Sequence, residues 1–250
     1  MDFSKLNFGV DGDSITADKQ WSWYVYENLG LKSHYNVAVG SSVWYKRTIA
    51  TKDGAVTTQD YDDPDFAGIS GGWEETDDLN ELQMRANNCA VVHTQKFIHD
   101  VKAGLAPIPD IFAFAMGTND SIDCLGDADT ALMGKTLKNV NVFTEAGAMR
   151  WCIQRIYEEF PQVRVFILTP IQTATPEHND KIRKQIPIIR QIANAFGAHV
   201  IDCFNECAII EKFETIGGAG KYLRDGLHPD YEGQCLEGRF ALKEIRNNMY

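Results

Sequence analysis

Short apolar runs along the chain alternate with longer segments in which apolar side chains recur every three or four residues. The short runs are continuously apolar, which is typical of strands that are covered on both faces of a parallel sheet. Strands that alternate with helices form right-handed crossover units, so the pattern predicts an α/β fold with helices on both faces of the sheet. The predicted strands span residues 6–10, 36–39, 111–116, 163–168 and 199–202.

Three helices are predicted from apolar residues at helical spacing and from the residues at their ends. Thr144 is a suitable N-cap and Pro161 a stop for the first helix, and Gly197 is placed to end the second. Pro187 lies inside the second helix and should kink it or delay its start. The predicted helices span residues 143–160, 180–196 and 230–247.

Residues 46–88 interrupt this alternation with an acidic segment that is rich in glycine and turn-forming residues and has no clean period. The segment contains no apolar core of its own, so we expect one domain over residues 1–250 with an insertion at about 46–88. Ligands of parallel α/β sheets bind beyond the carboxyl ends of the strands. We therefore expect the insertion to lie over that face.

The net charge of −11 argues against nucleic acid or an anionic membrane surface as a partner and suits a neutral or cationic substrate. The expected partner is a small-molecule or oligosaccharide ester. No apolar run approaches the roughly 20 residues that cross a bilayer. The protein is expected to be cytoplasmic if Met1 is the native start, and secreted or periplasmic if a signal peptide was removed. The six cysteines are expected to be reduced thiols in the core, although the sequence leaves open a Cys203–Cys207 bridge and the oligomeric state.

Polar residues follow the first three predicted strands, and a further polar motif, "DGLHPD", stands near the end of the chain. Ester hydrolysis by a serine needs a hydroxyl, an imidazole that takes its proton and a carboxylate that orients the imidazole. Ser14, His228 and Asp225 fill these three roles. The reaction also needs N–H donors where negative charge develops, and the backbone amides of Ser14 and Gly40 with the Asn119 side chain are the candidates.

Other interpretations of single motifs remain open. Ser14 is also expected to cap the helix that follows it and to gain from the helix dipole. Ser70, in "GISGG", fits the nucleophile motif G-x-S-x-G, but an acidic, proline-containing segment precedes it instead of a buried strand. The acidic insertion could supply a carboxylate pair for glycoside hydrolysis. Trp44 and Trp73 adjoin the strand ends and are candidates for stacking on a sugar.

Taken together, "GDSIT", the glycine after the second strand, "GTND" and Asp-x-x-His resemble the SGNH (GDSL-type) hydrolase family. The resemblance implies a three-layer α/β/α, flavodoxin-like fold with a five-stranded parallel sheet. It also implies hydrolysis of esters through an acyl-serine intermediate without metal or cofactor, with a catalytic triad, an oxyanion hole and a supporting role for Asp13. The polar insertion favours removal of acetyl or other short acyl groups from carbohydrate. A lipase or thioesterase and a catalytically silent carbohydrate-binding module are the alternatives.

Overall fold

A five-stranded parallel sheet forms the centre of the protein in the computed structural model, which describes residues 1–17, 20–60, 76–134 and 136–249. In order of appearance along the chain, its strands lie side by side as second, first, third, fourth and fifth, which is the flavodoxin-like order. The predicted α/β fold is confirmed. The strands, in spatial order, are β2 (Ser33–Asn36), β1 (Asn7–Gly12), β5 (Ile111–Ala115), β6 (Arg164–Leu168) and β7 (His199–Ile201).

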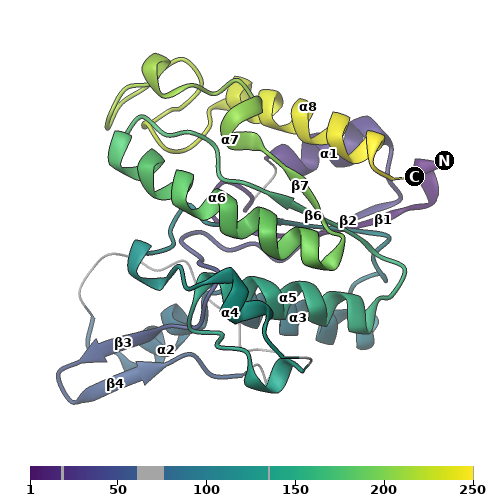
Figure 1. Cartoon of the computed structure of the whole chain (residues 1–250). Helices are drawn as coiled ribbons and strands as arrows, with labels where there is room; N and C mark the ends of the chain where they lie inside the picture. Colours follow the sequence, from purple (N-terminus) through teal and green to yellow (C-terminus); the bar gives the residue numbers. More distant parts are fainter. Residues whose placement is uncertain (18–19, 61–75, 135, 250) are drawn as a thin grey trace.

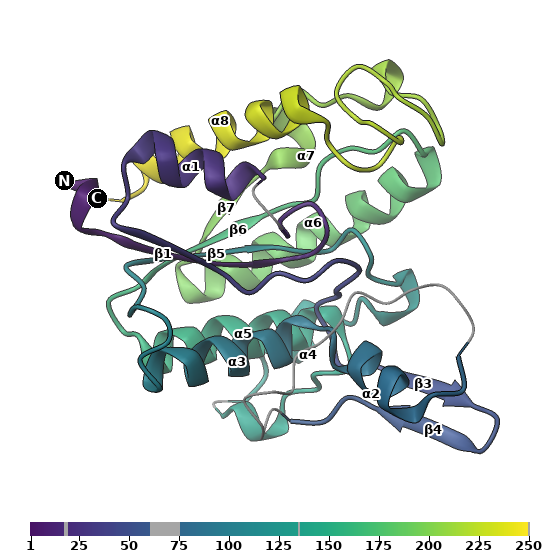
Figure 2. The same cartoon turned by 180° about the vertical axis from the view of Figure 1, so that it is seen from behind.

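Helices cover both faces of this sheet, with α1 and α8 packed together on one face and α3 and α5 on the other (Figures 1 and 2). Successive side chains of β5 point to opposite faces: Ile111 joins the core under α1 and α8, and Phe112 joins the core under α3 and α5. The helices are α1 (Trp21–Leu29), α3 (Ala90–Lys102), α4 (Ala128–Leu132), α5 (Glu145–Glu159), α6 (Pro176–Phe196), α7 (Cys203–Glu206) and α8 (Tyr231–Asn247). Short 3-10 turns occur at Phe3–Lys5, Ile122–Cys124, Leu137–Asn139 and Glu211–Phe213.

The ends of the predicted helices agree well with the structure. The Thr144 hydroxyl caps α5 by accepting a hydrogen bond from the Gly147 amide at 3.2 Å. Gly197 ends α6 in the left-handed conformation, with a φ of 66°. However, α6 begins at Pro176 rather than at residue 180, because proline is well suited to the first turn of a helix, where its missing N–H is not needed. Pro187 lies inside the continuous helix.

The second strand lies earlier in the chain than predicted. It spans Ser33–Asn36 rather than residues 36–39. Asn36 ends it, because its side chain accepts a hydrogen bond from the Ala38 amide and donates one to the Thr16 carbonyl. The apolar residues that suggested a strand still run beside β1, where the amides of Val37 and Val39 bond to carbonyls of that strand.

The insertion contains regular structure that its sequence did not predict. It forms an antiparallel hairpin of β3 (Thr48–Thr51) and β4 (Gly54–Thr57), followed by α2 (Leu79–Asn87), which Asp78 caps. The hairpin and α2 lie at the end of the molecule opposite the two termini (Figures 1 and 2). In the described ranges, no helix has the length and apolar character to cross a membrane.

Candidate active site

The fold brings the amino-terminal serine and the carboxyl-terminal histidine together. Ser14 follows β1, and His228 precedes α8, which packs on the same face of the sheet as α1. The Ser14 Oγ atom lies 2.9 Å from Nε2 of His228, across 214 residues of chain. This distance is suitable for direct proton transfer between hydroxyl and imidazole.

Asp225 binds the other side of the same imidazole. Its Oδ2 atom lies 2.8 Å from Nδ1 of His228, while its Oδ1 atom accepts hydrogen bonds from the amides of Leu227 and His228 at 3.0 and 2.7 Å. One carboxylate oxygen therefore shapes the turn and the other orients the ring. The three-residue spacing of Asp225 and His228 makes this division possible, because it is the spacing of an Asx-type turn.

The protonation states follow from these contacts. Burial alone raises the pKa of Asp225, but the His228 amide and imidazole outweigh it and hold that pKa below its usual value. The ionised carboxylate can only accept, so Nδ1 of His228 carries the proton and Nε2 is free to accept the proton of Ser14. This is the tautomer that a serine nucleophile needs.

Gly226 allows the turn to close. Its φ is 83°, and a Cβ atom there would lie 2.5 Å from the Thr215 carbonyl oxygen. Both the left-handed conformation and the close approach require glycine. The turn is fastened further by a hydrogen bond from the Arg224 amide to the His228 carbonyl at 2.9 Å.

Ser14 lies in a turn that Asp13 organises, and it does not cap a helix. The Asp13 side chain accepts from the Ile15 amide at 2.9 Å, and its carbonyl accepts from the amides of Thr16 and Ala17. Helix α1 begins only at Trp21. The predicted capping role of Ser14 and its gain from a helix dipole are therefore wrong.

Ser42 ties the candidate oxyanion residues to the serine turn. Its hydroxyl donates to the Gly12 carbonyl at 2.8 Å, and its carbonyl accepts from the Asn119 side-chain amide at 3.1 Å. Gly40 lies two residues earlier, and its own carbonyl accepts from the Asn88 side chain. Sequence reasoning missed Ser42, although it stands two residues after the glycine in "VGSS".

The loop that carries Asn119 is anchored from α6. His178 and Lys181 lie one turn apart on this helix, and both side chains bond to the Thr118 carbonyl, at 2.7 and 2.6 Å. Neither residue was predicted to belong to the site, because no local motif marks them. The spacing of three residues on one helix was the signal available.

Asp11 forms a buried pair beneath the site. Its Oδ1 atom accepts a hydrogen bond from the Gly12 amide at 2.8 Å, and the same atom lies 2.8 Å from Nδ1 of His93. Burial raises the pKa of Asp11 although His93 opposes this rise. The pairing with His93, which is 82 residues away in the chain, was not predicted.

The two candidate tryptophans have different outcomes. Trp44 is completely buried and packs against Phe114 with ring centroids 5.3 Å apart, so the prediction that it stacks on a sugar is wrong. Trp44 adjoins the strand ends in the sequence, but its side chain points inward and joins the core. Trp73 lies outside the described residues, as does the rival nucleophile Ser70.

Three described carboxylates of the insertion bind lysines or cap a helix. Asp60 pairs with Lys46 at 2.6 Å, Asp77 pairs with Lys52 at 2.7 Å, and Asp78 caps α2. These contacts give no support to a catalytic carboxylate pair. All six cysteines, Cys203 and Cys207 among them, are free thiols.

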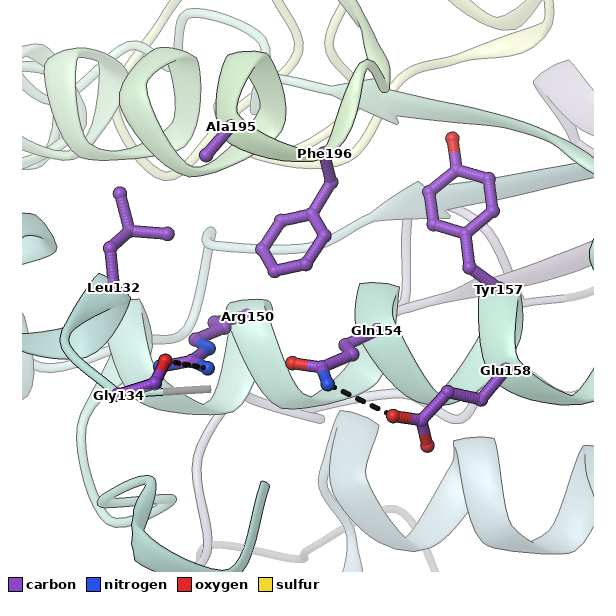
Figure 3. Close-up of a pocket in the computed structure, with 8 residues that line it drawn as sticks. All are labelled: Leu132, Gly134, Arg150, Gln154, Tyr157, Glu158, Ala195 and Phe196. Atoms are coloured by element: carbon purple, nitrogen blue, oxygen red, sulfur yellow. Dashed lines mark hydrogen bonds between the residues drawn. The ribbon is translucent and has the colours of Figure 1, made fainter. Parts of the chain in front are cut away.

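A groove between α5 and α6 is separate from these residues (Figure 3). Arg150 crosses its floor and donates to the carbonyls of Met133 and Gly134 at 2.8 and 2.9 Å, and Gln154 donates to Glu158 at 2.9 Å. These polar side chains form hydrogen bonds within the protein. None of the candidate catalytic residues lines this groove.

Comparison with known proteins identifies the family. Residues 9–236 match the family of GDSL-like lipases and acylhydrolases. The chain belongs to this family. A GDSL-like acylhydrolase is a hydrolase of esters, and the four motifs of the present chain all lie within the matched residues. No curated protein sequence matches this GDSL-like chain significantly.

Solved structures share the fold of this GDSL-like protein at low sequence identity. A lipase/acylhydrolase from Enterococcus faecalis is 15% identical, with a TM-score of 0.53 and coverage of 97% of this chain and 96% of that one. A carbohydrate esterase family 2 enzyme with a carbohydrate-binding domain, from Corynascus thermopiles, is 18% identical, with a TM-score of 0.54 and coverage of 97% and 66%. A protein from Lactobacillus plantarum has a TM-score of 0.58 at 13% identity and covers 98% of each chain.

Proposed function

We propose that the protein is a serine esterase in which Ser14 is the nucleophile, His228 the general base and Asp225 the residue that orients His228. The observation that carries the proposal is the continuous chain of contacts from Ser14 to His228 at 2.9 Å and from His228 to Asp225 at 2.8 Å. Positioned proton transfer of this kind contributes roughly 10²–10⁴-fold to rate.

The reaction proceeds in two halves. His228 takes the proton of Ser14 as Oγ attacks the ester carbonyl, and the negative charge that develops is stabilised by the amides of Ser14 and Gly40 and by the Asn119 side chain. The tetrahedral intermediate then collapses, the alcohol leaves with the proton from His228, and an acyl-serine remains. Water, activated by the same imidazole, releases the acid and restores Ser14.

The substrate we propose is a carbohydrate that carries acetyl or another short acyl group. The polar, acidic character of residues 46–88 and the lack of a long apolar segment to line an acyl-chain groove support this choice. Trp44 no longer contributes to this argument, because it is buried. Structural neighbours include both a lipase/acylhydrolase and a carbohydrate esterase, so long-chain esters are the natural competing substrate.

The test compares acetate release from an acetylated oligosaccharide with hydrolysis of nitrophenyl esters of increasing acyl length. We expect the protein to release acetate and its kcat/KM for nitrophenyl esters to fall as the acyl chain lengthens. Ser14→Ala should hydrolyse neither kind of substrate, whereas the exposed control Ser4→Ala should keep both activities. A preference for long chains would contradict the carbohydrate substrate. Folded protein that hydrolyses no ester would contradict the enzyme function, and release of reducing sugar without acid would indicate a glycosidase.

A further inference from the structure

A small internal cavity lies behind the turn that carries Ser14. The centre of a water-sized sphere can move through a volume of about 10 Å³ inside it. This is close to the space that one water molecule needs. Polar side chains from four parts of the chain line it, and each of them is almost completely buried. They are Asp13, Thr16, Thr118, Thr169 and Glu237.

Two carboxyl oxygens in this lining lack a satisfactory hydrogen bond. Glu237, on α8, is only 3% exposed, and its Oε2 atom has no partner among the described residues. Oδ2 of Asp13 also makes no well-formed hydrogen bond there, although Thr118 lies near enough to lower the pKa of Asp13. Buried polar atoms are nearly always paired, so these two oxygens call for a partner that the cavity can hold.

The two carboxyl groups do not both carry a charge at neutral pH, because both are buried and no cation among the described residues lines the cavity. Asp13 is the better placed to ionise. It accepts the Ile15 amide, and His228 favours its charged form. Lys181 also interacts with the Asp13 charge. Burial raises the pKa of Asp13 to about 6, whereas burial and the nearby Asp13 raise the pKa of Glu237 to about 8.

We infer that Glu237, held as a neutral acid, binds one water molecule in this cavity and through it supports the Asp13 carboxylate, which makes Glu237 a positioning residue for the Ser14 turn. This inference rests on the proposed esterase function. Such a water would satisfy Oε2 of Glu237 and Oδ2 of Asp13 together. Asp13 in turn holds the amide of Ile15, the residue next to Ser14.

Loss of the Glu237 proton would place a second negative charge against Asp13 and weaken that turn. Other titratable groups lie near this pair of carboxyl groups. Burial raises the pKa of Cys203 well above its usual value and that of Cys207 to about 12, with Glu237 adding to both shifts. From α1, the phenol Tyr24 packs against the neighbouring Gly238. Burial also raises the pKa of Asp120 to about 7, and the Asp13 charge adds to this rise. Asp120 is present in the wild type and in every Glu237 variant, so a comparison between them isolates the Glu237 proton.

A first experiment measures denaturant unfolding of the wild type, Glu237→Gln and the control Glu232→Gln, an exposed glutamate on the same helix. A pKa that is raised on folding stabilises the protein below the unfolded value and loses this effect as pH rises through the folded value. The ratio of the unfolding equilibrium constant of the wild type to that of Glu237→Gln should therefore increase with pH. The expected increase is up to about tenfold per pH unit between about pH 5 and 8. A constant ratio across this range would overturn the inference, and Glu232→Gln should follow the wild type.

A second experiment measures ester hydrolysis of the same variants against pH. We expect kcat/KM of the wild type and Glu232→Gln to fall above about pH 8, and Glu237→Gln, which keeps the shape of the neutral acid, to retain activity at pH 7 and lose this decline. An unchanged decline in Glu237→Gln would overturn the positioning role. A crystal structure should show water within hydrogen-bonding distance of both carboxyl groups, and an empty cavity would overturn the bridge.

The two experiments separate this inference from the proposed function. If the wild type hydrolyses no ester, the esterase proposal and the positioning role fall together. The unfolding measurement still decides whether Glu237 is protonated in the folded protein, because it needs no substrate. If the wild type is active but Glu237→Gln behaves like it in both measurements, only the inference about Glu237 fails.

Discussion

At the scale of single residues, the site depends on the two different tasks of the Asp225 carboxylate. One oxygen accepts backbone amides and the other accepts the imidazole proton of His228. An asparagine side chain at this position could keep only one set of these contacts. Its NH₂ group would face either the backbone N–H donors or the ring N–H, and two donors cannot bond to each other. The side chain therefore has to be an acceptor at both oxygens.

Asp225→Asn should lower kcat by about 10⁴-fold, because it allows the imidazole tautomer that cannot take the Ser14 proton. Steady-state hydrolysis of an activated acetyl ester measures this effect. Asp53→Asn, an exposed residue in the β3–β4 turn, is the matched control and should leave kcat unchanged. A loss of less than tenfold in Asp225→Asn would mean that Asp225 does not orient the base.

Individual site residues differed in how far the sequence could predict them. Ser14, Asp225 and His228 were predicted because each stands in a recognisable motif at a strand or helix end. Ser42 and Lys181 were not, because their roles consist of contacts to carbonyls that only the folded chain brings near. Trp44 was misjudged, since the sequence does not show which way a loop residue points.

At the scale of elements, the turn from Asp225 to His228 depends on Gly226 as much as on the two residues that flank it. Gly226→Ala should lower the free energy of unfolding by more than about 1–2 kcal/mol, the usual cost of a left-handed non-glycine residue, because its Cβ would also meet the Thr215 carbonyl at 2.5 Å. Ester hydrolysis should fall with it.

The control for this substitution is Gly104→Ala, at a position with a φ of 74° and no atom within 4 Å of an added Cβ. Chemical denaturation of both variants separates backbone strain from crowding. Equal losses of stability would show that the contact with Thr215 adds nothing.

Helix α6 contains an exposed proline, Pro187, within its 21 residues. Pro187→Ala should raise the free energy of unfolding by about 1–3 kcal/mol, because alanine restores a backbone N–H and removes the proline clash in a helix interior. The exposed Lys184→Ala in the same helix should change stability by less than about 0.5 kcal/mol. Thermal or denaturant unfolding that shows Pro187→Ala to be destabilised would contradict this account of the helix.

Apolar periodicity and capping residues predicted which helices and strands exist better than they predicted the first and last residue of each. The strands and the caps at Thr144 and Gly197 follow from local chemistry that the sequence displays. The shift of β2 could not be predicted, because it depends on contacts of the Asn36 side chain with the Ser14 turn and its neighbours. The insertion hairpin was missed because its strands are only four residues long and lie in a segment that is rich in turn-forming residues.

At the scale of the whole molecule, buried acids should make stability fall as pH rises. Burial raises the pKa of Asp13 to about 6 and that of Glu237 to about 8, and it raises that of Asp120 as well. Groups with raised pKa values stabilise the folded state at low pH and lose that contribution as pH rises through the folded values. Ion-paired carboxylates act oppositely: a hydrogen bond from Lys46 holds the pKa of Asp60 below its usual value.

The free energy of unfolding should therefore be greatest near about pH 5 and decrease towards pH 8 by up to about 1.4 kcal/mol per pH unit for each proton lost. Urea unfolding at pH 5, 6.5 and 8 measures this dependence. A stability that is constant or rises over this range would contradict the protonated state of the buried acids. The sequence could not predict this behaviour, because it arises from burial of acids that lie in separate motifs.

The most direct test of the central claim is to label the folded protein with a fluorophosphonate and to map the modified peptide by mass spectrometry. The account predicts a single adduct on Ser14, loss of ester hydrolysis in step with labelling, and no labelling in His228→Ala. Ser70→Ala should label like the wild type. An adduct on Ser70 or another serine, or full hydrolytic activity in protein whose Ser14 is modified, would contradict the account.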